Sequence, residues 1–341
     1  MNKINIILIF AILLLIMITH EYSLDHFADQ VNYALTNYKN HGLNSINFDH
    51  VIIGGLGGSG IGGRIAKSYF YDKAKLPIEV FSDYVLPSYT SKRSLVILSS
   101  YSGTTEETLA MYNQAKSIGS TIICITSGGD LDNKAKEDNI AVYNIETGYQ
   151  PRMALGFSLT FNLLILGELF QVNVSDQLKQ VTTLYNDNQN FKDKAKWLLE
   201  QFENKLNNKF VIVCDNSTEA LSIRFCQQIQ ENAKTEAFVN VLPEANHNVF
   251  ETYYGELPSN FIFINSNNND RNNGRFAYLK QLLENTKNTV VSIDLNQSTL
   301  MELYKTIYIC DWFSIYLSNA KGKDNMSVPN IVNLKNFLKT F

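Results

Sequence analysis

Short apolar runs alternate with longer segments of helical periodicity along most of the chain. Five runs in the first half lack the polar–apolar alternation of half-exposed strands, so they predict parallel β-strands buried on both faces. They span residues 51–54, 78–81, 95–99, 121–126 and 141–145. Segments with helical character cover residues 23–38, 61–71, 106–118 and 154–170. This order of elements predicts a doubly wound α/β lobe.

The second half of the chain repeats the same plan. Apolar runs predict strands at residues 210–214, 237–242, 261–265 and 289–294, with a helix at 218–232. A polar stretch, residues 176–193, is expected to join the halves as a helix and a loop. The Asn-rich run 265–273 is expected to be a solvated loop rather than a site. The predicted fold class is therefore α/β, with two doubly wound parallel-sheet lobes, residues 22–175 and 176–341, related by a degenerate duplication.

The first 21 residues form an apolar extension whose role the sequence leaves open. An unbroken apolar run, Ile6–Ile18, follows Lys3, as in a secretory signal. No small-x-small cleavage site follows the run. The run is also shorter than the roughly 20 apolar residues that a bilayer span needs. A translation start at Met17 would instead leave an ordinary cytosolic protein. We expect a cytoplasmic location and no membrane partner, with export or tethering by this run as the alternative.

Composition is that of a soluble globular protein and excludes some partners. The 341 residues are enough for two lobes with separate cores. The 33 acidic and 29 basic residues show no clustered basic surface of the kind that nucleic-acid binding normally needs. The cysteines lie in apolar stretches without metal-ligand spacing, so we interpret them as reduced core residues and expect no metal site. They are Cys124, Cys214, Cys226 and Cys310.

A glycine-rich segment, Gly54–Gly63, follows the first predicted strand and opens a helix. Glycines allow backbone N–H groups to approach an anion closely, and a helix N-terminus favours negative charge. A dinucleotide-binding fold uses a similar turn, and Asp83 after the next strand keeps that alternative open. A merely tight strand-to-helix turn is the other alternative. The segment alone therefore indicates an anion site without identifying the anion.

A row of hydroxyl residues, Ser99–Thr108, stands at the end of another predicted strand and also precedes a helix. Its O–H and N–H donors could surround a phosphate monoester. No Walker lysine follows, which disfavours a nucleoside triphosphate. The alternative is a helix capping box, with Thr104 or Thr105 as the cap and Glu107 or Thr108 reciprocating. Capping explains one threonine but not the whole row.

At these residues the chain resembles the sugar isomerase (SIS) domain proteins, whose phosphate loop is similar to SYSGTTEET. The closer resemblance is to the bifunctional phosphoglucose/phosphomannose isomerases, and it extends from about residue 22 to the C-terminus. It is carried by Gly54–Gly63, Thr126–Gly129, Pro151–Gly156 and Gln228–Asn248. The resemblance implies a sugar phosphate ligand and no cofactor. It assigns the phosphate to Gly58, Ser59, Ser100, Ser102 and Thr105.

Two motifs carry the strongest part of the resemblance. They are QENAK at residues 230–234 and PEANHN at residues 243–248. It implies that Glu231 transfers the proton and that His247 opens the sugar ring. Taken alone, Glu231 would be a solvated acid at a helix end and His247 a loop histidine. Moving a proton between C1 and C2 requires a carboxylate base, and the enediol charge requires a fixed cation. Arg152 is our candidate cation, with a structural salt bridge as its alternative role.

The resemblance also implies a homodimer, because the family's histidine reaches the site from the neighbouring subunit. Lys335 matches a lysine that the family places at the site from its C-terminal helix. The family's threonine near the sugar C2 is missing, and Ser327 is the only hydroxyl in that window. Val249 stands where family members commonly carry an acid.

We therefore expect interconversion of glucose 6-phosphate, and possibly mannose 6-phosphate, with fructose 6-phosphate through an enediol. Two alternatives remain. One is a non-catalytic SIS sugar-phosphate sensor, which would not need Glu231, and the other is an isomerase of another sugar phosphate.

Overall fold

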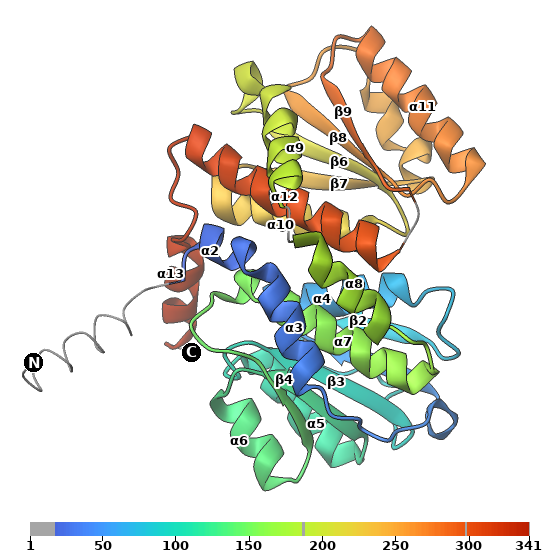
Figure 1. The fold of residues 1–341 in the computed structure, drawn as a ribbon, viewed down its shortest axis with the longest axis vertical. Helices are drawn as coiled ribbons and strands as arrows, with labels where there is room; N and C mark the ends of the chain where they lie inside the picture. Colours follow the sequence, from blue (N-terminus) through green and yellow to red (C-terminus); the bar gives the residue numbers. More distant parts are fainter. Residues whose placement is uncertain (1–17, 186–187, 297–298, 341) are drawn as a thin grey trace, which may run out of the picture.

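The computed structural model describes residues 18–185, 188–296 and 299–340, and within them two parallel sheets lie one above the other along the long axis (Figure 1). The first sheet has the strand order β2-β1-β3-β4-β5. Its strands are β1 (His50–Gly54), β2 (Ile78–Phe81), β3 (Ser94–Ser100), β4 (Thr121–Thr126) and β5 (Ala141–Asn144). Every pairing is parallel, so the predicted doubly wound lobe is confirmed.

The second sheet has the order β7-β6-β8-β9, again with parallel pairs throughout. Its strands are β6 (Lys209–Asp215), β7 (Ala237–Leu242), β8 (Ser259–Asn265) and β9 (Val290–Asp294). In both sheets the chain starts at an inner strand, adds a neighbour on one side and then crosses to the other side. The reversal falls between β1 and β3 in the first sheet and between β6 and β8 in the second. This shared winding confirms the predicted pair of lobes.

The expectation that all five strands of the first lobe are buried on both faces is wrong at the edges. β3 is buried along its whole length, and β1 and β4 are buried except at their first residue. β2 and β5 are largely intermediate or exposed, because each has a strand on only one side. Apolar composition therefore predicted the strands but not their order in the sheet.

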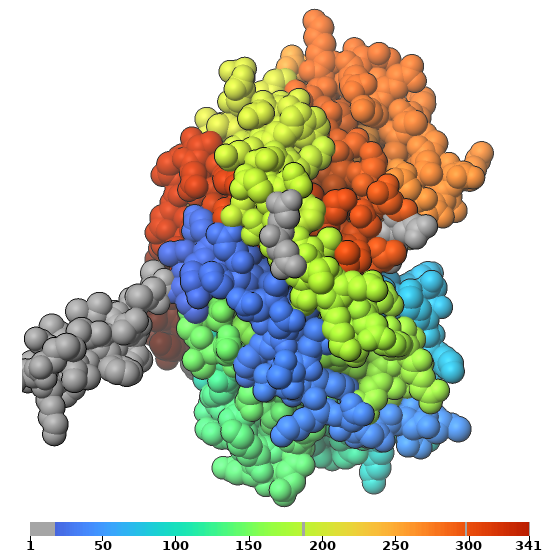
Figure 2. Space-filling view, viewed as in Figure 1, coloured from blue at the N-terminus to red at the C-terminus, as the bar shows by residue number. Residues whose placement is uncertain are grey.

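A layer of helices between the sheets joins the lobes (Figure 1). Helix α4 contacts α10, and α12 contacts both α8 and α2. Figure 2 shows α3, in blue, beside α8, in yellow-green, across the middle of one face. The helices are α2 (His20–Asp25), α3 (Phe27–Asn37), α4 (Gly57–Tyr69), α5 (Glu106–Ile118), α6 (Gly129–Glu137), α7 (Leu155–Phe170), α8 (Ser175–Leu184), α9 (Gln189–Glu200), α10 (Glu219–Ala233), α11 (Asp270–Asn285), α12 (Leu300–Ala320) and α13 (Pro329–Leu338).

The segment at the start of the described chain is packed into the fold. Thr19 caps α2, and the side chain of His20 is fully buried, with its Nε2 3.3 Å from the Gln228 amide nitrogen. The apolar run of the sequence, apart from Ile18, and the alternative start at Met17 lie outside the described residues. Among the described helices, none has the length and hydropathy needed to cross a bilayer.

The Asn-rich run is only in part the solvated loop that its composition predicted, because residues 267–269 are exposed loop but the two ends of the run are structured. Asn265 ends β8, and Ser266 is buried. Asn269 accepts hydrogen bonds from the N–H groups of Arg271 and Asn272, so it caps α11, which begins inside the run. Asparagine favours such caps because its short side chain reaches the free N–H groups of the first turn.

The four cysteines are free and buried, as expected from their apolar surroundings. Burial raises the pKa of Cys124 and of Cys226 to about 12. These thiols are therefore protonated at neutral pH, which fits core residues rather than nucleophiles.

His20 makes stability depend on pH. Burial, and then the charges of Arg152 and Arg224, lower the pKa of His20 to about 3, against an ordinary value near 6.5. Since the folded protein resists protonation, the contribution of neutral His20 is complete above about pH 6.5 and is lost as the pH falls towards 3, by about 1.4 kcal/mol per pH unit.

We therefore expect His20→Gln to flatten the loss of unfolding free energy between pH 7 and pH 5, measured by urea denaturation. The partly exposed His26, as His26→Gln, is the matched control. An unchanged pH dependence in His20→Gln would contradict this role for the buried imidazole.

Candidate active site

Two helix N-termini without side-chain caps meet at the carboxyl edge of the first sheet. Helix α4 begins after β1, and its N-cap residue is Leu56, which has no polar side chain. Helix α5 begins after β3, and its N-cap residue Thr105 makes no side-chain bond to the first turn. The free N–H groups of both helices and their dipoles favour an anion here. The capping explanation of the hydroxyl row is therefore wrong for Thr105.

The hydroxyl groups of the loop between β3 and α5 bond to one another. Ser100 Oγ lies 2.9 Å from Thr105 Oγ1 and accepts the N–H of Gly103 at 3.2 Å. Ser102 Oγ accepts the N–H and the hydroxyl of Thr104 at 3.3 and 3.1 Å. This arrangement brings Ser100 and Thr105 together, with Ser102 on the exposed side of the same loop.

A second loop packs against the loop between β3 and α5, which we call the hydroxyl loop. Gly103 has φ +67°, and a Cβ at this position would stand 1.8 Å from the carbonyl oxygen of Gly128. Gly103 also accepts the N–H of Leu131 through its own carbonyl. The segment Thr126–Gly129 thus holds the turn at Gly103, which gives this motif a structural role.

The start of α4 connects the hydroxyl loop to Arg152. Ser59 Oγ accepts the N–H of Tyr101 at 3.0 Å. A Cβ on Gly58 would lie 2.5 Å from the carbonyl oxygen of Pro151 and 2.8 Å from the nitrogen of Arg152. Position 58 therefore has room only for glycine, and α4 touches both the hydroxyl loop and the backbone of Arg152.

Arg152 lies in the 3₁₀ helix Pro151–Met153, and only 5% of its surface is exposed. Its Nη1 is 3.4 Å from Glu231 Oε2, and its Nε donates to Asn232 Oδ1 at 3.1 Å. Its Nη2 donates to the carbonyl oxygens of Asn325 and Met326 at 2.7 and 3.0 Å. Burial lowers the pKa of Arg152, while Glu231 acts in the opposite direction. The guanidinium is thus fixed from four sides, next to the predicted base.

A buried polar network below Arg152 was not predicted from the sequence. Arg224 forms an ion pair with the fully buried Asp311 and donates to the carbonyl oxygen of Arg152 at 3.1 Å. Asn232 donates to Ser314 Oγ at 2.9 Å, and Ser314 donates to the carbonyl oxygen of Asp311. Burial raises the pKa of Asp311, and Arg224 opposes this shift. The network closes a ring that passes through α10, α12 and Arg152.

Glu231 lies in the last turn of α10, with 28% of its side chain exposed. Lys234, in the left-handed conformation at φ +52°, ends this helix. Its Nζ donates to the carbonyl oxygens of Glu231, Asp324 and Ser327. Lys234 therefore fixes the end of α10 against the segment that leads to α13. The QENAK motif contains this residue, but no role was predicted for it.

His247 and Lys335 are exposed and are not bonded to the Arg152–Glu231 pair among the described residues. His247 is exposed, in the turn Glu244–His247, and lines a surface groove with Arg271 and Arg275. Lys335 is on α13, whose residues are all exposed. Within the described part of the chain, no hydrogen bond or ion pair joins either side chain to Arg152 or Glu231.

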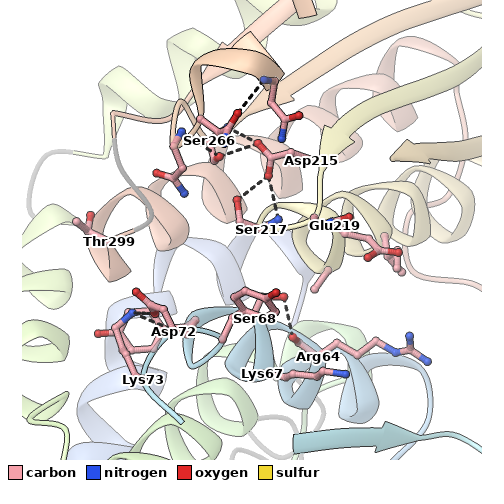
Figure 3. A pocket seen from close by; sticks show the side chains of 18 of the residues that line it. Arg64, Lys67, Ser68, Asp72, Lys73, Asp215, Ser217, Glu219, Ser266 and Thr299 are labelled. Atoms are coloured by element: carbon pink, nitrogen blue, oxygen red, sulfur yellow. Dashed lines mark hydrogen bonds and ion pairs between the residues drawn. The ribbon is translucent and has the colours of Figure 1, made fainter. Parts of the chain in front are cut away.

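A cleft of about 930 Å³ lies elsewhere, at the carboxyl edge of the second sheet (Figure 3). None of the predicted site residues lines it. The described residues contain no group of His, Cys, Asp and Glu side chains arranged to hold a metal ion.

Two family models match the chain. The SIS domain model matches residues 46–166. The model described as bacterial phospho-glucose isomerase C-terminal SIS domain matches residues 191–338.

Full-length relatives and solved structures agree with these matches. A bifunctional phosphoglucose/phosphomannose isomerase from Caldicellulosiruptor bescii is 35% identical over 93% of this chain and 98% of its own length. One from Aquifex aeolicus is 32% identical over 85% and 90%. The C-terminal domain of glucosamine-fructose-6-phosphate aminotransferase from Francisella tularensis has a TM-score of 0.72 at 15% identity, over 89% of this chain and 97% of that one. These similarities favour the sugar-isomerase interpretation of Gly54–Gly63 over the dinucleotide-fold alternative.

The contact of Gly58 with Arg152 generates a prediction. We expect Gly58→Ala to lower the free energy of unfolding by about 1–3 kcal/mol, since an added methyl group must displace backbone atoms. Activity should fall as well, because the displaced atoms belong to Pro151 and Arg152. Urea denaturation and kcat/KM measure the two effects.

The matched control is Gly274→Ala in α11, where a Cβ has no neighbour within 4 Å. This change should raise stability by up to about 1 kcal/mol, because alanine favours a helix over glycine. A Gly58→Ala protein as stable and as active as the unchanged protein would show that the contact is not restrictive.

Proposed function

Because the chain belongs to the family of bifunctional phosphoglucose/phosphomannose isomerases, we propose that it interconverts glucose 6-phosphate and mannose 6-phosphate with fructose 6-phosphate through an enediol. The observation that carries the proposal is the Arg152–Glu231 pair, which stands beside the anion-binding start of α4. A sensor that only binds sugar phosphates would not need this pair. An aldose–ketose isomerase needs both members.

The first domain, residues 22–175, holds the substrate phosphate in this proposal. The N–H groups at the starts of α4 and α5, including those near Gly58 and Ser59, face the anion. The hydroxyl groups of Ser100, Ser102 and Thr105 give up their present bonds within the loop and bond to phosphate oxygens instead. Hydrogen bonds to a charged group typically contribute about 1.5–3 kcal/mol each, so the phosphate anchors the sugar.

The second domain, residues 176–341, supplies the base. Glu231 removes the proton from C2 of the open-chain aldose and returns it to C1, while the C1 oxygen gains a proton and the C2 hydroxyl loses one, so that an aldehyde becomes a ketone with no net change in protons. The negative charge on the enediol oxygens is balanced by Arg152, whose position is fixed before the substrate binds. Preorganised charge of this kind is usually the largest single contribution to catalysis.

A homodimer completes the site. In its own chain His247 is exposed, and among the described residues its side chain makes no hydrogen bond, which fits a residue that acts on a neighbouring subunit. Helix α13 exposes apolar side chains that a second subunit would cover, and it also carries Lys335. The exposed apolar residues are Ile331, Val332, Leu334, Phe337 and Leu338.

Ser327 is the hydroxyl nearest in sequence to the position of the family's missing threonine. It bonds to Asp324 and helps to lower the pKa of that carboxyl. We propose that this serine serves both aldose phosphates, and that the enzyme acts in the cytoplasm, where charged sugar phosphates are retained.

A coupled assay of the purified protein with glucose 6-phosphate, mannose 6-phosphate and glucosamine 6-phosphate tests the assignment. Turnover of the first two substrates is expected. Binding without turnover would favour a sensor, and turnover of glucosamine 6-phosphate alone would favour another isomerase.

We expect Glu231→Gln to lose isomerisation while it keeps sugar-phosphate affinity, because an amide retains the shape of the carboxylate but cannot accept the proton. The expected loss in kcat is about 10²–10⁴-fold. Calorimetric titration with glucose 6-phosphate measures the retained binding. The control is Glu236→Gln, which removes an exposed acid directly before β7. If Glu231→Gln kept more than about a tenth of wild-type turnover, Glu231 would not be the base.

The shared site predicts complementation between two inactive proteins. Mixing Glu231→Gln with His247→Ala produces hybrid dimers in which one site carries both lesions and the other carries neither. Half of the dimers in a random mixture are hybrid, so activity should approach roughly a quarter of that of wild-type sites.

Subunit exchange is verified by native mass spectrometry in the same samples. If exchange occurs and no activity returns, His247 acts within its own chain and the shared-site proposal is wrong. The isomerase assignment would stand, because each single variant is compared with the wild type separately.

A further inference from the structure

The cleft at the carboxyl edge of the second sheet takes no part in the chemistry above, and we propose that it is a second ligand site, for a phosphorylated polyol such as a sugar phosphate. Its volume of about 930 Å³ suits a small metabolite. The loops after β6 and β8 form one wall, and the end of α4 with the turn after it forms the opposite wall (Figure 3).

The position of the cleft is the first argument. In doubly wound sheets, ligands bind outside the carboxyl ends of the strands, at the point where the strand order reverses. The phosphate loop occupies that point between β1 and β3 in the first sheet. The cleft occupies the corresponding point between β6 and β8 in the second.

The loop donors on the sheet side are already satisfied by the protein itself. Asp215 is buried, and its Oδ1 accepts the N–H groups of Ser217 and Thr218 at 2.9 and 3.2 Å. Its Oδ2 accepts the N–H of Ser266 at 3.0 Å (Figure 3). A carboxylate of the chain thus occupies the place that phosphate takes in the first lobe, so the anionic end of a ligand must bind elsewhere in the cleft.

The opposite wall offers the cations for that end. Arg64 and Lys67 project from α4 and form no ion pair with any described residue, whereas Lys73 is paired with Asp72. Asp215, which is bonded only to neutral donors, and Glu219 lie on the sheet side of the cleft, so the unpaired positive charge is concentrated on the α4 wall. A guanidinium and an ammonium three residues apart on one helix can bind a phosphate together.

Uncharged polar groups also line the cleft on the sheet side. They include the amides of Asn216 and Asn272. Amides and hydroxyls both donate and accept hydrogen bonds, as the hydroxyls of a polyol require. Phosphate at Arg64 and Lys67, with the polyol towards Asn216, therefore satisfies both parts of the ligand.

Binding of sorbitol 6-phosphate tests the site, because this hexitol has a phosphate but no carbonyl group to isomerise. Calorimetric titration should give two sites per chain in the wild type. Arg64→Gln with Lys67→Gln should weaken one of them at least about tenfold while kcat/KM for glucose 6-phosphate stays unchanged. Ser100→Ala with Thr105→Ala should weaken the other site only.

Location and ligand class are checked in the Ser100→Ala/Thr105→Ala protein. Sorbitol 6-phosphate should protect residues 64–73 and 215–219 from amide hydrogen exchange. The control Lys75→Gln with Lys92→Gln removes two exposed charges outside the cleft and should leave this protection intact.

A single site per chain, insensitive to Arg64→Gln/Lys67→Gln, would overturn the proposal. Equal affinity for inorganic phosphate would overturn the polyol assignment. Because both of these results are read from binding, neither depends on isomerase activity.

Discussion

The need to satisfy one buried guanidinium fixes how the two lobes meet. Arg152 comes from the first lobe, yet its donors bind Asn232 and the carbonyl oxygens of Asn325 and Met326, all in the second half of the chain. A buried charge without partners would cost several kcal/mol, so the lobes are held at the separation that supplies them. The three polar partners hold Nε and Nη2, and Gly58 packs against the backbone of Arg152. The remaining nitrogen, Nη1, therefore faces Glu231. The geometry of the proposed chemistry is thus a consequence of interdomain packing.

The second buried ion pair makes this arrangement rigid. Arg224 and Asp311 lie below Arg152, and their network returns to it through Ser314 and Asn232. Breaking such a pair by removing one partner typically costs about 3–5 kcal/mol, because a charge is left buried and unpaired. Helix α12, which belongs to neither sheet, therefore positions the site through Asp311 and Ser314. The proposed base and cation rest on helix packing more than on strands.

The sequence predicted those parts of the molecule that have a local signal. Apolar runs located the strands, and the hydroxyl row pointed to Ser100 and Thr105, whereas Glu231 became a candidate only through the family resemblance at QENAK. The burial of edge strands was mispredicted, because strand order depends on long-range pairing. The Asn-rich run was mispredicted at its end, because a cap such as Asn269 is recognised only when the following helix is known. The Arg224–Asp311 pair was missed because its members are 87 residues apart and each looks like an ordinary charge in its own segment.

The two sheets show why a duplicated topology need not give two equal sites. At the β1/β3 reversal, the helices begin without side-chain caps, and the loop hydroxyls bond to one another and to N–H groups of their own loop. At the β6/β8 reversal, α10 also begins without a side-chain cap, but Asp215 accepts the N–H groups of the loops and Asn269 caps α11. Uncapped N-termini lower stability unless a ligand satisfies them, a cost that functional sites commonly carry. Strand order therefore specifies where an anion could bind in each lobe, and the internal carboxylate Asp215 explains why we propose phosphate at the loops of the first lobe only.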